Sequence, residues 1–257
     1  MPFSLPYYRD AGELPGPLPD QNEIDQATRT LPKTSDYGGR LVVIRDAFVV
    51  KYGPLVTENE GYALLFDTLH IVMEYIPGIS LGTAWPSLTE MRALPSPGFY
   101  GSVDQGPVPH RYFFSREQDP AVTGPIRTEE EFGKAIALRS QNMWSECSSH
   151  SVLSDYLVRH LPVALRGHPP MFTHGDLYRE NVLVRKVVDS VTNEEECELA
   201  ALVDWETAGW YPSHWEYAHI FPLLRWIDDW PAYVEKILDP LPLEGAMMWV
   251  VFREMEF

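Results

Sequence analysis

The sequence is short of basic residues. Lysine and arginine together number 20 against 37 aspartate and glutamate residues, so the formal net charge is −17. An acidic balance of this size repels phosphate backbones and anionic lipids, and no local cluster of basic residues reverses it. We therefore expect neither nucleic acid nor a membrane as a partner.

Cysteine is scarce as well, since only Cys147 and Cys197 occur and neither belongs to a CxxC pair. Two such thiols supply neither a disulfide framework nor a four-cysteine zinc site. The longest apolar run, residues 246–252, is far below the ~18 residues of a membrane span. Residues 1–10 lack the basic and apolar stretches of a targeting signal. These absences predict a cytoplasmic protein.

Proline is abundant, with 23 among 257 residues, which is roughly twice its average share. Six prolines and four glycines fall within residues 94–126, and they predict a long loop. A loop of this length is usually functional or an insertion. The hydrophobic share of 45% is still enough to build one large domain or two lobes.

Strands are predicted in the first part of the chain. Residues 41–44 and 48–52 are rich in β-branched and aromatic side chains and suggest a hairpin. Another buried strand is expected over residues 70–75. The helices expected in this part cover residues 20–31 and 57–66.

Helices dominate the second part. Thr128 and Glu131 have capping-box spacing and open one helix. The other elements expected here are a helix at 152–161, strands at 182–188 and 199–203 around an acidic turn at 193–196, and helical structure over 210–257. This order of elements predicts an α+β protein with a β-rich lobe over residues 1–75 and a helical lobe over residues 76–257.

Chemistry concentrates between residues 173 and 206. Asp176 and Asn181 lie on a loop that leads into a strand, and Asp204 closes the following hairpin. Phosphoryl transfer needs an acceptor for the hydroxyl proton, oxygen ligands for Mg²⁺ and a cation on the nucleotide phosphates. Asp176 can fill the first role and Asn181 with Asp204 the second, while Lys51 can supply the cation.

The protein-kinase catalytic loop has the spacing H-R-D-L-x-x-x-N, and HGDL followed by Asn181 matches it except that Gly175 replaces arginine. With LVDWE and GWYPSHWEYA, this segment resembles the aminoglycoside phosphotransferase-like family, in particular its branch in filamentous fungi. FVVKYG, TENEGYALLF and HIVMEYIPGISLGTAWPSL extend the resemblance over most of the chain. The resemblance implies a bilobal protein-kinase-like fold and a small-molecule kinase that uses ATP and Mg²⁺.

The resemblance also implies roles for single residues. Asp176 would be the catalytic base, Asn181 and Asp204 would bind Mg²⁺, and Lys51 would contact the α- and β-phosphates of ATP. Because Asp176 takes the proton, we expect His174 to hold the loop by hydrogen bonds rather than to transfer a proton.

A helix glutamate should orient Lys51. Glu60 is preferred for this role, although Glu58 competes, since two residues on a helix differ by about 200° and only one can face the strand. The strand HIVMEYI would lead to an interlobe hinge. There Met73 would line the adenine pocket, and backbone groups of Glu74, Tyr75 and Ile76 would meet adenine.

Two departures from the family pattern support an alternative function. A kinase phosphate loop reads G-x-G-x-x-G, yet only Gly38 and Gly39 stand near the first hairpin. The chain between Glu60 and Glu74 is also too short for the additional strand that the family has there. The alternative is therefore an inactive, pseudokinase-like binding module. A metal-dependent hydrolase that uses the two aspartates and Asn181 without Lys51 is a third option.

The predicted reaction transfers the γ-phosphoryl group of ATP to a hydroxyl of a small molecule. Trp205 and Glu206 stand where protein kinases have Phe-Gly, and no A-P-E segment follows, so a small acceptor is favoured over a protein. Aminoglycosides, choline-like amines, sugars and homoserine-like compounds all remain open as acceptors, and the acidic balance favours a cationic one.

Aromatic and histidine residues near the C-terminal end have plainer interpretations. An aromatic box for a cation is one reading, but such clusters more often belong to the core; the residues are Trp205, Trp210, Tyr211, Trp215 and Tyr217. His214 and His219 lack zinc-ligand spacing with any third histidine or cysteine, so the sequence predicts no zinc site there.

Overall fold

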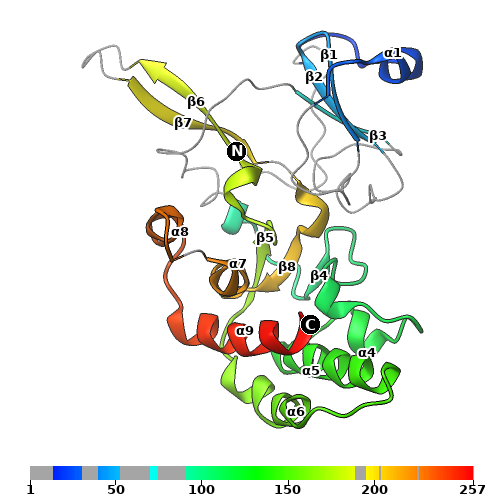
Figure 1. Ribbon diagram of the computed structural model, residues 1–257, viewed down its shortest axis with the longest axis vertical. Helices are drawn as coiled ribbons and strands as arrows, with labels where there is room; N and C mark the ends of the chain where they lie inside the picture. Colours follow the sequence, from blue (N-terminus) through cyan, green and yellow to red (C-terminus); the bar gives the residue numbers. More distant parts are fainter. Residues whose placement is uncertain are drawn as a thin grey trace. The chain divides into compact units, whose positions relative to one another are not determined.

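The computed structural model in Figure 1 describes residues 14–30, 40–52, 70–74, 91–188, 195–202, 204–224 and 226–256. The chain divides into two compact units, one of Met1–Ala84 with Arg179–Glu206 and one of Trp85–Tyr178 with Thr207–Phe257. The described residues combine helices with small antiparallel sheets, in agreement with the predicted α+β class. The predicted lobe boundary at residues 75–76 lies outside the described residues and stays a prediction.

A three-stranded antiparallel sheet forms the first unit's main element. Its order is β1 (Arg40–Ile44), β2 (Phe48–Tyr52) and β3 (His70–Glu74), so β2 is central. The predicted hairpin is confirmed, and its turn residues Arg45 and Asp46 both have positive φ. The helix predicted over residues 57–66 lies outside the described residues.

A short helix, α1 (Gln21–Gln26), precedes this sheet. Asp20 and Glu23 form a capping box, in which each side chain accepts from the backbone N–H of the other residue. The helix is shorter than the predicted residues 20–31. The chain leaves it because Thr30 pairs with Val42 as an isolated bridge at the edge of the sheet.

The first unit also contains a two-stranded ribbon of β6 (Val182–Val188) and β7 (Glu195–Leu202). Val182 pairs with Leu202 at one end, and Val188 pairs with Glu195 at the other. The acidic turn predicted at residues 193–196 was placed too late in the sequence, because Glu195 and Glu196 already belong to β7.

The second unit has a small sheet of β4 (Gly101–Ser102), β8 (Gly209–Pro212) and β5 (Pro170–Thr173), in that order. Predicting residues 210–257 as helical was wrong at the start, since β8 pairs with both neighbours before the helices begin. The predicted loop at 94–126 also contains short elements, namely β4, the 3-10 turn η2 (Arg111–Phe113) and α4 (Pro120–Thr123).

Helices are the main elements of this unit (Figure 1). They are α5 (Glu129–Glu146), α6 (Val152–Ala164), α7 (Trp215–Ile220), α8 (Trp230–Ile237) and α9 (Pro242–Met255). The capping box of Thr128 and Glu131 that opens α5 is confirmed. None of the helices within the described ranges has the length and apolar character needed to cross a bilayer.

The aromatic side chains of α7 and β8 are core residues. Trp215 is fully buried, stacks on Tyr211 and meets Phe132 edge to face. Trp210 and Tyr217 are buried as well. The core interpretation is therefore confirmed for these residues, and their packing fixes the position of α7 against β8 and α5.

Candidate active site

Lys51 lies in β2, the central strand of the first unit's sheet, opposite Leu41 on one side and Ile71 on the other. Its side chain is only 8% exposed. The ammonium group forms an ion pair with the carboxylate of Asp204, and Glu206 Oε2 lies 3.6 Å from Nζ. A lysine this buried is stable only when its charge is paired, so the sheet and the segment after β7 hold each other here.

Asp204 has a backbone conformation that few aspartates adopt. Its φ is +67°, in the left-handed region. The indole of Trp205 donates to the Leu202 carbonyl at 2.8 Å and closes this turn. Strain of this kind concentrates at functional sites. The turn also brings in Glu206, whose pKa is raised by burial and by the nearby Asp204 carboxylate, against the opposing effect of Lys51.

Asn181 ends the 3-10 turn η3 (Arg179–Asn181) and is buried. It directly precedes Val182, which pairs with Leu202. Asn181 and Asp204 therefore lie just past the same end of the β6–β7 ribbon. Amide and carboxylate oxygens are the hard ligands that Mg²⁺ prefers, so the donor set fits a magnesium ion.

Asp176 belongs to the second unit, on the loop that follows β5. It is half-buried, and its backbone N–H donates to Nδ1 of the fully buried His174 at 3.3 Å. The prediction that His174 holds this loop by hydrogen bonds is confirmed. The histidine ring thus braces the backbone of the residue that the sequence assigns as the base.

Glu216 on α7 also fixes this loop. Its two carboxylate oxygens accept the backbone N–H groups of His174 at 2.8 Å and of Gly175 at 3.1 Å. Glu216 is 1% exposed, and burial raises its pKa to about 7 against the lowering effects of Arg92 and the two N–H donors. The sequence analysis gave Glu216 no role, although a lone charge in the apolar run WEYAHI was a signal.

Gly175 explains why this loop departs from the protein-kinase pattern. Its φ is +83°, and a Cβ atom there would lie 2.7 Å from the Thr207 carbonyl oxygen. Thr207 also donates from Oγ1 to the His174 carbonyl at 3.2 Å. A side chain at position 175 would push these groups apart, so the arginine of the protein-kinase loop has no room here.

Of the predicted site residues, the structure brings Lys51 and Asp204 together and sets Asn181 at the ribbon end beside Asp204. Met73 and Glu74 lie in β3, where they pair with Val49 and Phe48. The remaining ones, Glu58, Glu60, Tyr75 and Ile76, lie outside the described residues and stay predictions.

Comparison with known proteins finds one family. The model of a family described as a phosphotransferase enzyme family matches residues 67–239. The matched range contains Asp176, Asn181 and Asp204, while Lys51 precedes it. A search of curated proteins finds no match.

Proposed function

Because the chain belongs to the phosphotransferase enzyme family, we propose that it transfers the γ-phosphoryl group of ATP, with Mg²⁺, to a hydroxyl of a small molecule. Membership indicates phosphotransferase activity on small molecules. ATP as the donor, Mg²⁺ as the metal and a bilobal protein-kinase-like fold are the further content of the proposal.

The observation that carries the proposal is the ion pair of Lys51 and Asp204. A buried cation beside a carboxylate on a strained turn provides a positive group for nucleotide phosphates and an oxygen ligand for a metal in one place. Asn181 would be the second protein ligand of the metal. Mg²⁺, when bound, neutralises charge on the transferring phosphoryl group.

Asp176 would accept the proton of the acceptor hydroxyl. Its loop is held by backbone groups, through the ring of His174 and the carboxylate of Glu216. A base fixed in this way contributes typically 10²–10⁴-fold to rate.

The acceptor remains a class rather than a compound. A small molecule with a free hydroxyl is proposed, and the net charge of −17 favours a cationic one. Aminoglycosides, choline-like amines, sugars and homoserine-like compounds are the panel to screen.

The test replaces Asp176 with asparagine. We expect Asp176→Asn to lower kcat roughly 1,000-fold in phosphoryl transfer from γ-labelled ATP to the panel, with unchanged circular dichroism. Asp155→Asn is the matched control, because Asp155 is an α6 residue that pairs with His150. Full activity of Asp176→Asn would remove this residue from the mechanism.

Titration with a non-hydrolysable ATP analogue, with and without Mg²⁺, separates the alternatives. Mg²⁺-dependent binding that Asp204→Asn abolishes is the result expected for a kinase. Absence of any nucleotide binding would favour the inactive binding module.

A further inference from the structure

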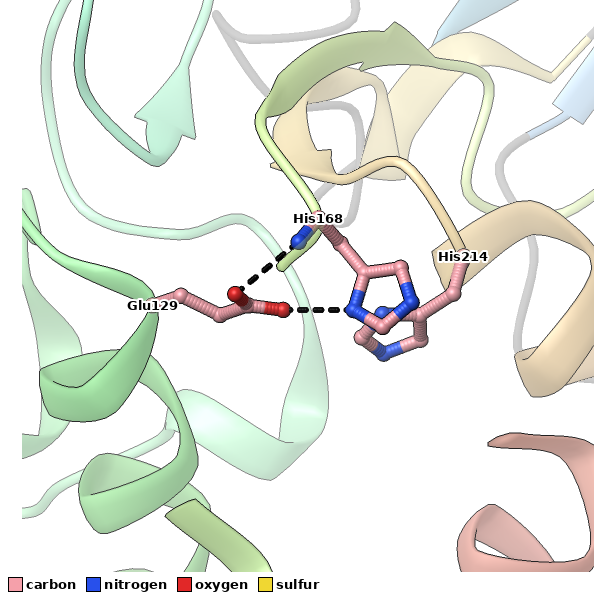
Figure 2. Close-up of side chains that lie close together, drawn as sticks. All are labelled: Glu129, His168 and His214. Carbon is pink, nitrogen blue, oxygen red and sulfur yellow. Dashed lines mark hydrogen bonds and ion pairs between the residues drawn. The ribbon is translucent and has the colours of Figure 1, made fainter. Parts of the chain in front are cut away.

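Three segments of the second unit bring Glu129, His168 and His214 together (Figure 2). Glu129 is the first residue of α5, His168 precedes β5, and His214 lies between β8 and α7. One ligand atom from each side chain lies within 4.8 Å of the other two. We propose that this cluster binds a divalent transition-metal ion, with Zn²⁺ as the best fit.

His214 carries the proposal. Its side chain is 1% exposed, and neither Nδ1 nor Nε2 has a hydrogen-bond partner among the residues that the structure describes. It occupies the N-cap position of α7 without capping the helix. A buried polar atom without a partner is destabilising, so an imidazole with two such atoms requires an explanation.

A cation beside His214 supplies that explanation. A neutral imidazole has one ring nitrogen with a lone pair that a cation can accept. The ring packs edge-on against His168, with centroids 4.5 Å apart and planes at 76°. A proton between Glu129 and His168 would give His168 a hydrogen bond. It would leave the ring nitrogens of His214 without a partner among the described residues.

His168 has a carboxylate at each ring nitrogen. Nδ1 lies 2.7 Å from Glu129 Oε1, and Nε2 lies 3.5 Å from Glu244 Oε1. An ion bound to Nδ1 would leave a hydrogen on Nε2 that points to Glu244. Metal-binding histidines commonly donate their other N–H to a carboxylate in this way.

Glu129 is fixed in place before any ion arrives. Its Oε2 accepts the backbone N–H groups of Gly167 at 2.6 Å and of His168 at 3.0 Å. Oε1 is thereby turned toward the two imidazoles, as Figure 2 shows. The carboxylate can bind an ion through Oε1 while Oε2 keeps its two backbone donors.

The donor set selects the metal. Two imidazoles and one carboxylate suit Zn²⁺, whereas Mg²⁺ and Ca²⁺ prefer oxygen ligands alone. With bonds of 2.0–2.1 Å, a tetrahedral site separates its ligand atoms by roughly 3.3 Å. Side-chain shifts of about 1 Å would close the present cluster to that spacing. The ion would take the place of the hydrogen on His168 Nδ1, and the neutral ring would carry that hydrogen on Nε2 instead, facing Glu244 Oε1.

The experiment is calorimetric titration of the full-length, EDTA-treated protein with ZnCl₂. We expect one equivalent to bind with a micromolar or lower Kd. Co²⁺ in place of Zn²⁺ should give visible absorption bands at the same stoichiometry.

Variants then locate the ion. His168→Gln and His214→Gln, each checked by circular dichroism, should weaken Zn²⁺ binding at least 100-fold. His160→Gln, at an exposed histidine of α6, and Asp204→Asn, at the proposed magnesium ligand, should bind as the wild type does. If His214→Gln fails to fold, His168→Gln decides, because its side chain is partly exposed. No binding by the wild type, or binding that His168→Gln retains, would overturn the proposal.

Discussion

The candidate residues of the first unit and those of the second unit are held in different ways. Around Lys51 and Asp204, in the first unit, side chains hold side chains through opposite charges. Around His174 and Gly175, in the second unit, one buried carboxylate holds the backbone. Charge pairs can change partners when a charged ligand binds, whereas backbone hydrogen bonds fix a loop. The first arrangement therefore suits a cation that exchanges its carboxylate partner for a nucleotide phosphate. The second suits a proposed base that must stay in one position.

The largest expected effect is a loss of activity when the positive charge of Lys51 is removed. Lys51→Met keeps the length of the side chain and removes the cation, so kcat/KM for MgATP should fall roughly 100- to 1,000-fold. Stability should change less, because Asp204 is about one-third exposed and can be solvated. Steady-state kinetics with a fixed acceptor measure the first effect, and urea unfolding measures the second.

Lys134→Met is the matched control, since Lys134 pairs with Glu130 on the surface of α5. Its kinetics should equal those of the wild type. A Lys51→Met enzyme as active as this control would mean that the buried charge is not used on the nucleotide.

A smaller effect is expected from disturbing the fixed loop. Gly175→Ala places a Cβ 2.7 Å from the Thr207 carbonyl oxygen at a left-handed φ of +83°, and we expect a loss of about 3 kcal/mol in unfolding free energy. Gly98→Ala is the control, because Gly98 has a φ of +82° and no atom of the described part of the chain lies within 4 Å of its added Cβ. That variant should lose about 1 kcal/mol. Equal losses would show that the contact with Thr207 carries no energy.

The smallest effect on turnover is expected from Glu216→Gln. An amide can accept only one of the two backbone N–H groups, so kcat should fall about 10-fold, in line with the loss of one hydrogen bond to a charged group. Glu254→Gln is the control, since its buried carboxylate accepts from Ser140 and Trp144 instead of from the catalytic loop. A Glu216→Gln enzyme with the wild-type kcat would show that the loop keeps its shape without this carboxylate.

The raised pKa of Glu216 should also make the free energy of unfolding depend on pH. Its pKa of about 7 in the folded protein is above the ordinary 4.5, so the folded state binds a proton that the unfolded state releases. The stabilisation is complete below pH 4.5 and is lost as the pH rises through 7. Between pH 5 and 8, urea unfolding should show the wild type losing roughly 2 kcal/mol relative to Glu216→Gln. A difference that does not change with pH would contradict the raised pKa.

Sequence reasoning succeeded where the signal is local. The hairpin of residues 41–52 and the capping box of Thr128 with Glu131 each depend on neighbours within a few residues. It failed where a distant segment decides. The helix after Asp20 ended early because Thr30 pairs with Val42 across a loop.

At the candidate site too, contacts between residues far apart in the sequence could not be predicted. Glu216 meets the backbone of His174, 42 residues away, and the spacing of the residues does not reveal it. The same holds for His168 and His214, which a search for regularly spaced zinc ligands passes over. By contrast, motif spacing was enough to propose Asp204 as a metal ligand, whereas its ion pair with Lys51 became visible only in the fold.

Helix α7 limits how this protein can be re-engineered. All six of its residues are buried, Glu216 holds the backbone of the loop that carries Asp176, and Trp215 lies in the core. Libraries aimed at new acceptors should therefore leave residues 215–220 unchanged and diversify more exposed positions. A variant that gains a new substrate through α7 would have to rebuild the catalytic loop at the same time.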